Sequence, residues 1–274
     1  MTIKKHPLLP LAAAMVTLTS VTTSASAAMV AFDANTGGAD TGFTGGWTGS
    51  GNVFITASTD LTYANYGITQ TGTPGNVYAS NAGPDRQDKR TVATPMSGTI
   101  WFSALVNVPA NANYGGLTIN NFNAGQPWNP ITTDLRVLLT PSALTVGFNG
   151  DPTTTGTGSF SPGTHLLLGQ MNIVAGNDTL SVWVDPDVNA AGSPGGLPAA
   201  NFTSTTIDFT DSLENLGVAG SKGAALTNVE VDAIRLSDTA TAFQDVTGVV
   251  AIPEPSAFAL FGLGGLALIL RRRK

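Results

Sequence analysis

The residues with the most specific chemistry lie in one short segment, Glu230 to Arg235. Side chains of a β-strand alternate between its two faces, so the carboxylates of Glu230 and Asp232 would share one face of a strand. Hydrolysis of a glycosidic bond with retention uses two carboxyl groups about 5 Å apart, one as nucleophile and one as acid/base. The segment is therefore a candidate catalytic strand.

This segment resembles the Glu-x-Asp-x-x-Glu strand of retaining glucanases, whose first Glu is the nucleophile and whose last Glu is the acid/base. Here Arg235 and then Leu236 stand where the last Glu belongs, so the proton donor is missing. Arg235 would instead lower the pKa of a nearby carboxylate. The other Glu of the body, Glu214, is expected in a loop. We therefore expect a protein that is not an enzyme, with a glycan-cleaving enzyme as the alternative.

A purely structural role also accounts for the segment. Glu230 and Asp232 would lie on an outer face, and Arg235 would pair with a neighbouring acid at the surface. The apolar residues of the segment would contribute to the core near a sheet edge. These residues are Val229, Val231, Ala233 and Ile234.

Metal and nucleophile chemistry is narrowly limited by composition. The chain has no cysteine, and His165 is the one histidine beyond the first 27 residues, which excludes thiol chemistry, a multi-histidine metal site and a histidine-based triad. We expect His165 to be structural. Asp185 and Asp187 could offer oxygens to calcium, although Asp-Pro-Asp is also an ordinary turn that ends a strand. No cofactor is expected, and calcium at these two residues is the alternative.

Aromatic residues beside Gly- and Asn-rich segments are candidate sugar platforms, since a ring can stack on a sugar while amides bind its hydroxyls. Trp128 and Asn129 are the candidate ligand-binding residues. The alternative is that such aromatics cover the open end of a sandwich. The other aromatics of this kind are Trp47, Tyr63, Tyr66, Tyr78 and Tyr114.

Charge is distributed unevenly along the chain. Residues 28–248 contain 6 of the 12 basic and 17 of the 18 acidic residues, which gives a formal net charge of −11. Such a surface repels nucleic acid and anionic lipid, so no nucleic-acid partner is expected. Residues 85–90 mix both signs and are expected to form a solvated loop.

The body shows alternating apolar patterns separated by Gly- and Pro-rich turns, and no sustained helical stripe. Ten or more short strands at this spacing predict a β-sandwich or jelly roll. The segments with these patterns are 99–108, 117–119, 135–139, 144–148, 166–174, 180–184 and 229–236.

The first 27 residues have the organisation of a signal peptide. A basic start is followed by a mostly apolar stretch, and Ala25-Ser26-Ala27 forms the small-x-small cleavage pattern. We place the cut after Ala27, with Ala28 as the alternative.

The last residues form a short tripartite tail. Pro253-Glu254-Pro255 precedes fifteen residues without charge, and Arg271-Arg272-Arg273-Lys274 follows. Fifteen helical residues reach about 22 Å, enough for a thin or temporary membrane span. The basic cluster would stay in the cytoplasm.

This tail resembles the PEP-CTERM sorting signal over roughly residues 250–274. The resemblance implies processing by an exosortase-type enzyme near Pro253-Glu254-Pro255, transient anchoring in the inner membrane, and a final place at the cell surface or in a biofilm matrix of polysaccharide. A plain C-terminal membrane anchor is the alternative.

Segments between about residues 95 and 240 also resemble a LamG-like or concanavalin A-like jelly roll. The segments that carry this resemblance are 101–106, 165–173, 180–187 and 230–236. The resemblance implies two curved antiparallel sheets of six or seven strands each and a common role in binding carbohydrate.

The prediction is thus an all-β protein with three parts: a signal peptide (1–27), a jelly-roll β-sandwich (28–248) and a sorting segment with a short transmembrane helix (249–274). Its expected function is that of an exported surface or matrix protein that binds polysaccharide without cleaving it. A structural envelope protein without a ligand is a further alternative.

Overall fold

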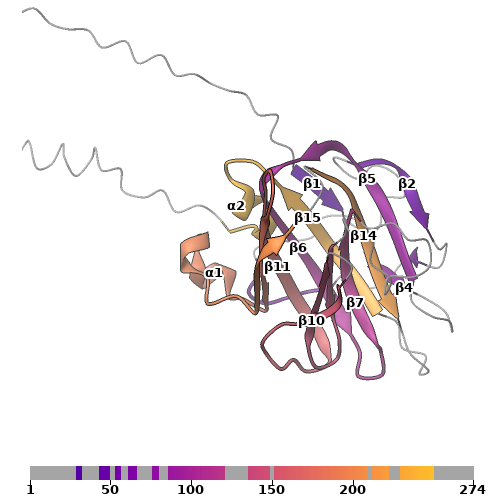
Figure 1. Ribbon diagram of the computed structural model, residues 1–274. Coiled ribbons are helices and arrows are strands. Elements are labelled where there is room, and N and C mark those ends of the chain that lie inside the picture. Colours follow the sequence, from indigo (N-terminus) through magenta and orange to yellow (C-terminus); the bar gives the residue numbers. More distant parts are fainter. Residues whose placement is uncertain are drawn as a thin grey trace, which may run out of the picture.

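The structure is a computed structural model with two antiparallel β-sheets (Figure 1). It describes residues 29–32, 43–49, 53–56, 61–66, 76–79, 86–120, 135–148, 151–208, 212–221 and 229–249.

The larger sheet has eight of the described strands, in the order β13-β12-β11-β6-β15-β4-β3, with β1 also paired to β15. All of its pairings are antiparallel. Its strands are β1 (Met29–Phe32), β3 (Val53–Thr56), β4 (Asn76–Ala79), β6 (Gly98–Val108), β11 (Gly163–Ile173), β12 (Asp178–Val184), β13 (Phe202–Ile207) and β15 (Val229–Ser237).

The second sheet has seven of the described strands, in the order β10-β9-β8-β7-β14-β5-β2. Consecutive strands β4, β5, β6 and β7 alternate between the two sheets, which confirms the predicted antiparallel jelly-roll β-sandwich. The strands of this sheet are β2 (Phe43–Gly49), β5 (Arg86–Met96), β7 (Tyr114–Ile119), β8 (Leu135–Leu139), β9 (Leu144–Phe148), β10 (Asp151–Thr155) and β14 (Leu213–Ser221).

The main hydrophobic core lies between the sheets. Alternate residues of β6 enter it, from Ile100 through Phe102 to Val108, as the period-two pattern predicts. Gly169 of β11 faces the Phe102 ring, and a side-chain carbon at this position would collide with that ring. A glycine is therefore required where the two central strands meet.

A second apolar layer covers the outer face of the eight-stranded sheet, because β6 and β11 are buried on both faces. We call it the outer cluster. Residues 61–66 and the helices α1 (Val188–Ala191) and α2 (Ala242–Thr247) supply its cover, and both helices lie on this side of the sandwich (Figure 1). Its members are Leu61, Tyr66, Trp101, Leu105, Leu166, Leu168, Trp183, Val188, Ala233, Ala242, Phe243, Val246 and Val249.

The expectation of a solvated loop at residues 85–90 is wrong for its described part. Residues 86–90 begin β5, and Asp88 and Arg90 are only 3% and 4% exposed. Arg90 lies opposite Leu216 in the register with β14, and both Asp88 and Arg90 alternate in phase with the core residue Val92. The charged side chains therefore face inward, which a pattern of apolar residues cannot indicate.

A bulge in β15 divides the apolar residues of this strand between the main core and the outer cluster. The register with β6 shifts between Asp232 and Arg235, and Ala233 has φ 50°, a left-handed conformation that costs a non-glycine residue about 1–2 kcal/mol. The bulge directs Val231 and Ile234 into the main core and Ala233 into the outer cluster.

The carboxylate of Asp232 holds this bulge together. It is fully buried, accepts a hydrogen bond from the backbone N–H of Ala233 at 2.8 Å, and accepts another from the backbone N–H of Leu61 at 3.0 Å. One side chain thus fixes the bulge and attaches the segment that covers it.

We predict that Asp232→Ala lowers the free energy of unfolding by about 3 kcal/mol, because two buried N–H groups lose their acceptor. Denaturant unfolding of the full-length chain measures the loss. Asp232→Asn is the matched control: it retains one acceptor oxygen and should lose less. An Asp232→Ala chain as stable as the wild type would contradict this role.

Candidate functional site

Several predicted site residues lie outside the described part of the chain. These are the candidate ligand-binding pair Trp128 and Asn129, the cleavage residues Ala25 and Ala27, and the tail residues Pro253, Glu254, Pro255, Arg271, Arg272 and Arg273. Their roles stay predictions.

The candidate catalytic strand is β15, and its carboxylates do share the outer face. Glu230 is half-buried and accepts a hydrogen bond from Asn107 Nδ2 at 2.9 Å. Asp232 lies on the outer face that the structural alternative predicted, but the segment that begins at Leu61 covers it and buries it fully. Nor is β15 an edge strand, because it pairs with β6 on one side and with β4 and β1 on the other.

Two charged residues that the sequence analysis considered beside Glu230, Arg235 and Glu214, are both described by the structure. Arg235 Nη1 lies 3.5 Å from the backbone carbonyl of Asp245. Glu214 is exposed, but it belongs to β14 in the opposite sheet. Neither of these two residues therefore takes the place of the missing acid/base, and the absence of catalysis stays a prediction.

The Asp185 turn ends β12, and its carboxylate is held by protein donors. Asp185 Oδ2 lies 2.6 Å from His165 Nδ1, and Oδ1 accepts from the backbone N–H of Leu166 at 2.9 Å. Asp187 caps α1 by accepting from the backbone N–H of Ala190. No group of three or more His, Cys, Asp or Glu residues suited to a metal occurs among the described residues. Calcium at Asp185 and Asp187 stays a prediction.

His165 joins the ends of two strands. Its Nε2 lies 2.7 Å from the carbonyl oxygen of Ser161, while Nδ1 faces Asp185, so both ring nitrogens can donate only in the protonated ring. The hydrogen bond with Asp185 raises the pKa of His165, in spite of the opposing effect of burial. Burial raises the pKa of nearby Tyr63 to about 12, and the charges of Asp185 and Asp187 add to that effect.

We predict that the His165–Asp185 contact makes stability depend on pH. A pKa that is higher in the folded state contributes stability that is complete below the unfolded value of about 6.5 and is lost as pH rises through the folded value. Unfolding of the wild type and His165→Gln should therefore differ most at acidic pH and converge at alkaline pH. A constant difference across pH would contradict this assignment.

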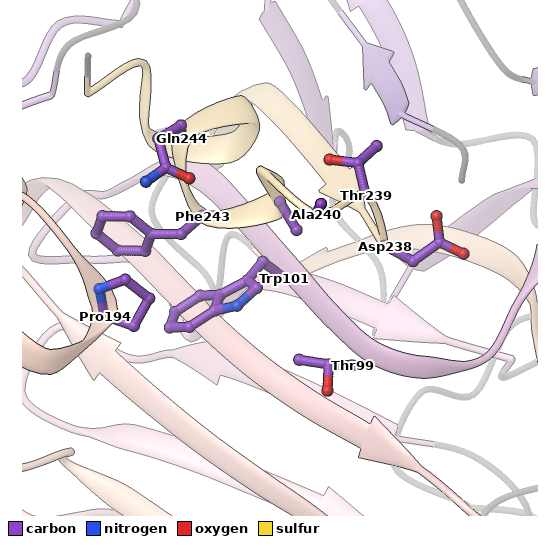
Figure 2. Close-up of a pocket in the computed structure, with 9 residues that line it drawn as sticks. Thr99, Trp101, Pro194, Asp238, Thr239, Ala240, Phe243 and Gln244 are labelled. Atoms are coloured by element: carbon purple, nitrogen blue, oxygen red, sulfur yellow. The ribbon is translucent and has the colours of Figure 1, made fainter. Parts of the chain in front are cut away.

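A pocket of about 430 Å³ opens on the same side of the sandwich as the outer cluster (Figure 2). It lies where the start of β6, the short helix η1 (Pro194–Gly196) and the β15–α2 connection meet. The described residues that line it are Thr99, Trp101, Pro194, Asp238, Thr239, Ala240, Ala242, Phe243 and Gln244.

The apolar wall of the pocket is aromatic. The Trp101 ring packs edge to face with Phe243 at 5.1 Å between centroids, and it stacks on Trp183 at 5.8 Å. Figure 2 shows Phe243 and Pro194 toward one end of the indole and Asp238 toward the other. Trp183 is itself held by a hydrogen bond from its Nε1 to the carbonyl of Pro198. Trp101 and Phe243 are only 4% and 2% exposed, so these two rings form the floor of the pocket, and the exposed Pro194 lines its apolar side.

The polar wall is organised by one carboxylate, Asp245, which does not line the pocket. Its Oδ2 accepts from Ser237 Oγ at 2.7 Å and from Thr239 Oγ1 at 2.5 Å, and its Oδ1 accepts from Thr241 Oγ1 at 3.2 Å. These bonds fold the β15–α2 connection back onto α2 and so set the position of the adjoining residue Asp238.

Two buried hydroxyl groups hold the helix α2 against the eight-stranded sheet. Ser103 Oγ donates to the carbonyl of Val246 at 2.6 Å, and Tyr66 Oη donates to the same carbonyl at 3.0 Å. Burial raises the pKa of Tyr66 to about 12, so its hydroxyl stays protonated as a donor. Tyr66, one of the aromatics proposed as a sugar platform, is thus a buried support.

Sequence reasoning missed this pocket entirely. Trp101 was assigned only to a strand, and α2 has six residues, which is too short to show a helical stripe. The signal that could have indicated it is the polar run from Ser237 to Thr241 directly before Phe243, which is typical of a capped turn.

We predict that Asp245→Ala releases the polar wall, because three hydroxyl groups lose their common acceptor. Amide hydrogen exchange at residues 237–244 should become faster, while exchange in the β8–β9 hairpin stays the same. Asp245→Asn, which keeps an acceptor oxygen, should give an intermediate effect. Unchanged exchange at 237–244 in Asp245→Ala would contradict the role of this carboxylate.

Comparison with protein families identifies the C-terminal tail. Residues 251–274 match the PEP-CTERM protein-sorting motif, which indicates an exported protein with a surface or extracellular location. No curated protein sequence matches the chain. Among the described residues, no helix is long and apolar enough to cross a membrane, and the predicted C-terminal span lies outside them.

Solved structures with a similar arrangement of strands have low sequence identity. A protein of unknown function from Shewanella oneidensis MR-1 is 13% identical, covers 85% of this chain and 96% of its own, and gives a TM-score of 0.46. The metal-free carbohydrate recognition domain of Emp46p is 11% identical, with 69% and 87% covered and a TM-score of 0.41. The carbohydrate-binding module CBM66 from Bacillus subtilis is 9% identical, with 69% and 94% covered and a TM-score of 0.38.

Proposed function

We propose that this exported protein binds saccharide in the Trp101 pocket, without cleaving it, after sorting through its PEP-CTERM tail. The observation that carries the proposal is one pocket in which an apolar floor of packed aromatic rings meets a hydrogen-bonded polar connection. Sugars combine apolar C–H faces with many hydroxyl groups, so they need both kinds of surface side by side.

The size and lining of the pocket suit a short saccharide. A volume of about 430 Å³ lies within the range of roughly 300–1,000 Å³ typical of small-molecule sites. The exposed Pro194 supplies apolar surface, and the nearly buried rings of Trp101 and Phe243 form the floor beneath it. Thr99, Asp238 and Gln244 supply side-chain groups that can hydrogen-bond to hydroxyls.

The absence of catalysis in this proposal rests on the carboxylates near the pocket. Asp238 is the one carboxylate among the described lining residues, and the adjacent Asp245 is occupied by three hydroxyl donors. Glycoside hydrolysis with two carboxyl groups on either side of the bond has no pair to use there.

The tail gives the proposed function its place in the cell. In this proposal an exosortase-type enzyme processes the chain near Pro253-Glu254-Pro255, after the apolar segment has held it in the inner membrane. The body then joins the cell surface or an extracellular matrix, where polysaccharide is the available ligand.

We predict that oligosaccharides made from the producer's own extracellular polysaccharide bind the full-length chain saturably. Gln244→Ala should weaken this binding about 3- to 10-fold, the effect of one lost hydrogen bond. Isothermal titration calorimetry measures both. Asn215→Ala is the matched control, since Asn215 is also a half-buried amide but belongs to β14 in the opposite sheet.

Three outcomes would count against this proposal. An absence of saturable binding would favour a structural envelope protein, and release of sugar fragments would favour an enzyme. Binding that EDTA abolishes would indicate a calcium-dependent site, for which the Asp185 turn is the candidate.

A further inference from the structure

A strip of polar side chains continues from the pocket across the outer face of the eight-stranded sheet. Directly opposite residues of antiparallel strands share a face, and Trp101 of β6 belongs to the outer cluster. The side chains in register with the Thr99–Trp101 end of β6 therefore also face outward. We call them the polar strip, and they are Gln170 and Asn172 of β11, Thr179 and Ser181 of β12, and Thr203 of β13.

The polar strip begins where the cover of the outer cluster ends. Leu168 of β11 and Trp183 of β12 lie opposite each other and are buried in that cluster. The next outward pair on these strands, Gln170 and Ser181, is half-buried, and Thr203 beyond it is exposed. The strip is thus open to solvent along its whole length.

The pocket and the polar strip are joined at Thr99. This residue lines the pocket, and its Oγ1 donates a hydrogen bond to Asn172 Oδ1 at 3.3 Å. In the view of Figure 2, Thr99 and Gln244 lie on opposite sides of the Trp101 ring. A ligand chain that fills the pocket can therefore leave it over the strip without crossing the helix α2.

We infer that the ligand is an extended polysaccharide chain, which holds one sugar residue in the pocket and lays the following ones across β11, β12 and β13 on the polar strip. This inference rests on the proposed function and names its ligand class. It distinguishes recognition of a polymer from binding of a single sugar or a disaccharide.

The chemistry of the polar strip suits a chain of sugars. Its five members carry only amide and hydroxyl groups, which donate and accept hydrogen bonds as sugar hydroxyls do. Neighbouring strands lie about 4.8 Å apart, so the path from β6 to β13 is about 14 Å long, more than one pyranose ring can cover. Similar groups that recur from strand to strand match a polymer of repeating units.

The first test compares ligands of two sizes on the wild-type, full-length chain. Disaccharide and hexasaccharide fractions are prepared by partial hydrolysis of the producer's own extracellular polysaccharide. The hexasaccharides should bind about tenfold or more tightly in titration calorimetry, since each added hydrogen bond contributes about 3- to 10-fold. A longer chain also gains affinity because it can bind in more registers, so substitution must assign the gain to the strip.

Gln170→Ala and Ser181→Ala remove polar groups from the strip, and neither residue is among the described residues that line the pocket. Each variant should weaken hexasaccharide binding about 3- to 10-fold and leave disaccharide binding within about twofold of the wild type. Asn215→Ala, in the opposite sheet, should change neither affinity. Circular dichroism of each variant verifies that the fold is kept.

A second measurement needs no variant and so does not depend on the folding of one. In NMR spectra of the wild type, the side-chain amide signals of Gln170 and Asn172 should shift strongly with hexasaccharide and much less with disaccharide. The side-chain amide signal of Asn215 should shift with neither.

The outcomes separate this inference from the proposed function. Equal affinity for the two fractions overturns the inference and leaves saccharide binding in the pocket intact. A gain with length that both variants keep in full, or unshifted signals of Gln170 and Asn172, does the same. If neither fraction binds, the proposed function itself fails.

Discussion

The bulge in β15, the outer cluster and the pocket all depend on the buried carboxyl group of Asp232. A carboxyl group with no access to water needs hydrogen-bond partners, and here these include the backbone N–H groups of Ala233 and Leu61. One donor stabilises an alanine in a left-handed conformation, and the other brings a segment 171 residues away onto the sheet. The bulge then lets β15 serve two apolar layers, since its residues change face at that point.

The pocket is a consequence of this second layer. Tyr66 reaches the layer from the segment that Asp232 attaches, and its hydroxyl meets Ser103 and the carbonyl of Val246 in α2. With α2 fixed in this way, Phe243 packs against Trp101, and the polar connection before the helix closes around Asp245. The buried carboxyl group of Asp232 thus supports the candidate site through hydrogen bonds that hold the covering segment and α2, and through the packing of Phe243 on Trp101.

The fold was predictable from the sequence where burial follows a simple period. The predicted boundaries of β8 and β9 match the structure, and β6 and β15 differ by only one residue at an end. The charged strand β5 was missed because Asp88 and Arg90 are buried polar residues. Ala233 gave no sign of a bulge, since glycine is the usual indicator of a left-handed residue.

The candidate site was much less predictable, because it is assembled from distant segments. Thr99 and Trp101 meet a connection about 140 residues later in the chain, and none of these residues belongs to a recognisable motif.

The central claim is that this pocket binds saccharide. Hydrogen exchange of the full-length chain, with and without saturating oligosaccharide from the native polysaccharide, tests this claim most directly. We expect slower exchange at residues 99–101 and 237–249 and no change in the β8–β9 hairpin, whereas protection confined to the seven-stranded sheet, or none, would contradict the claim.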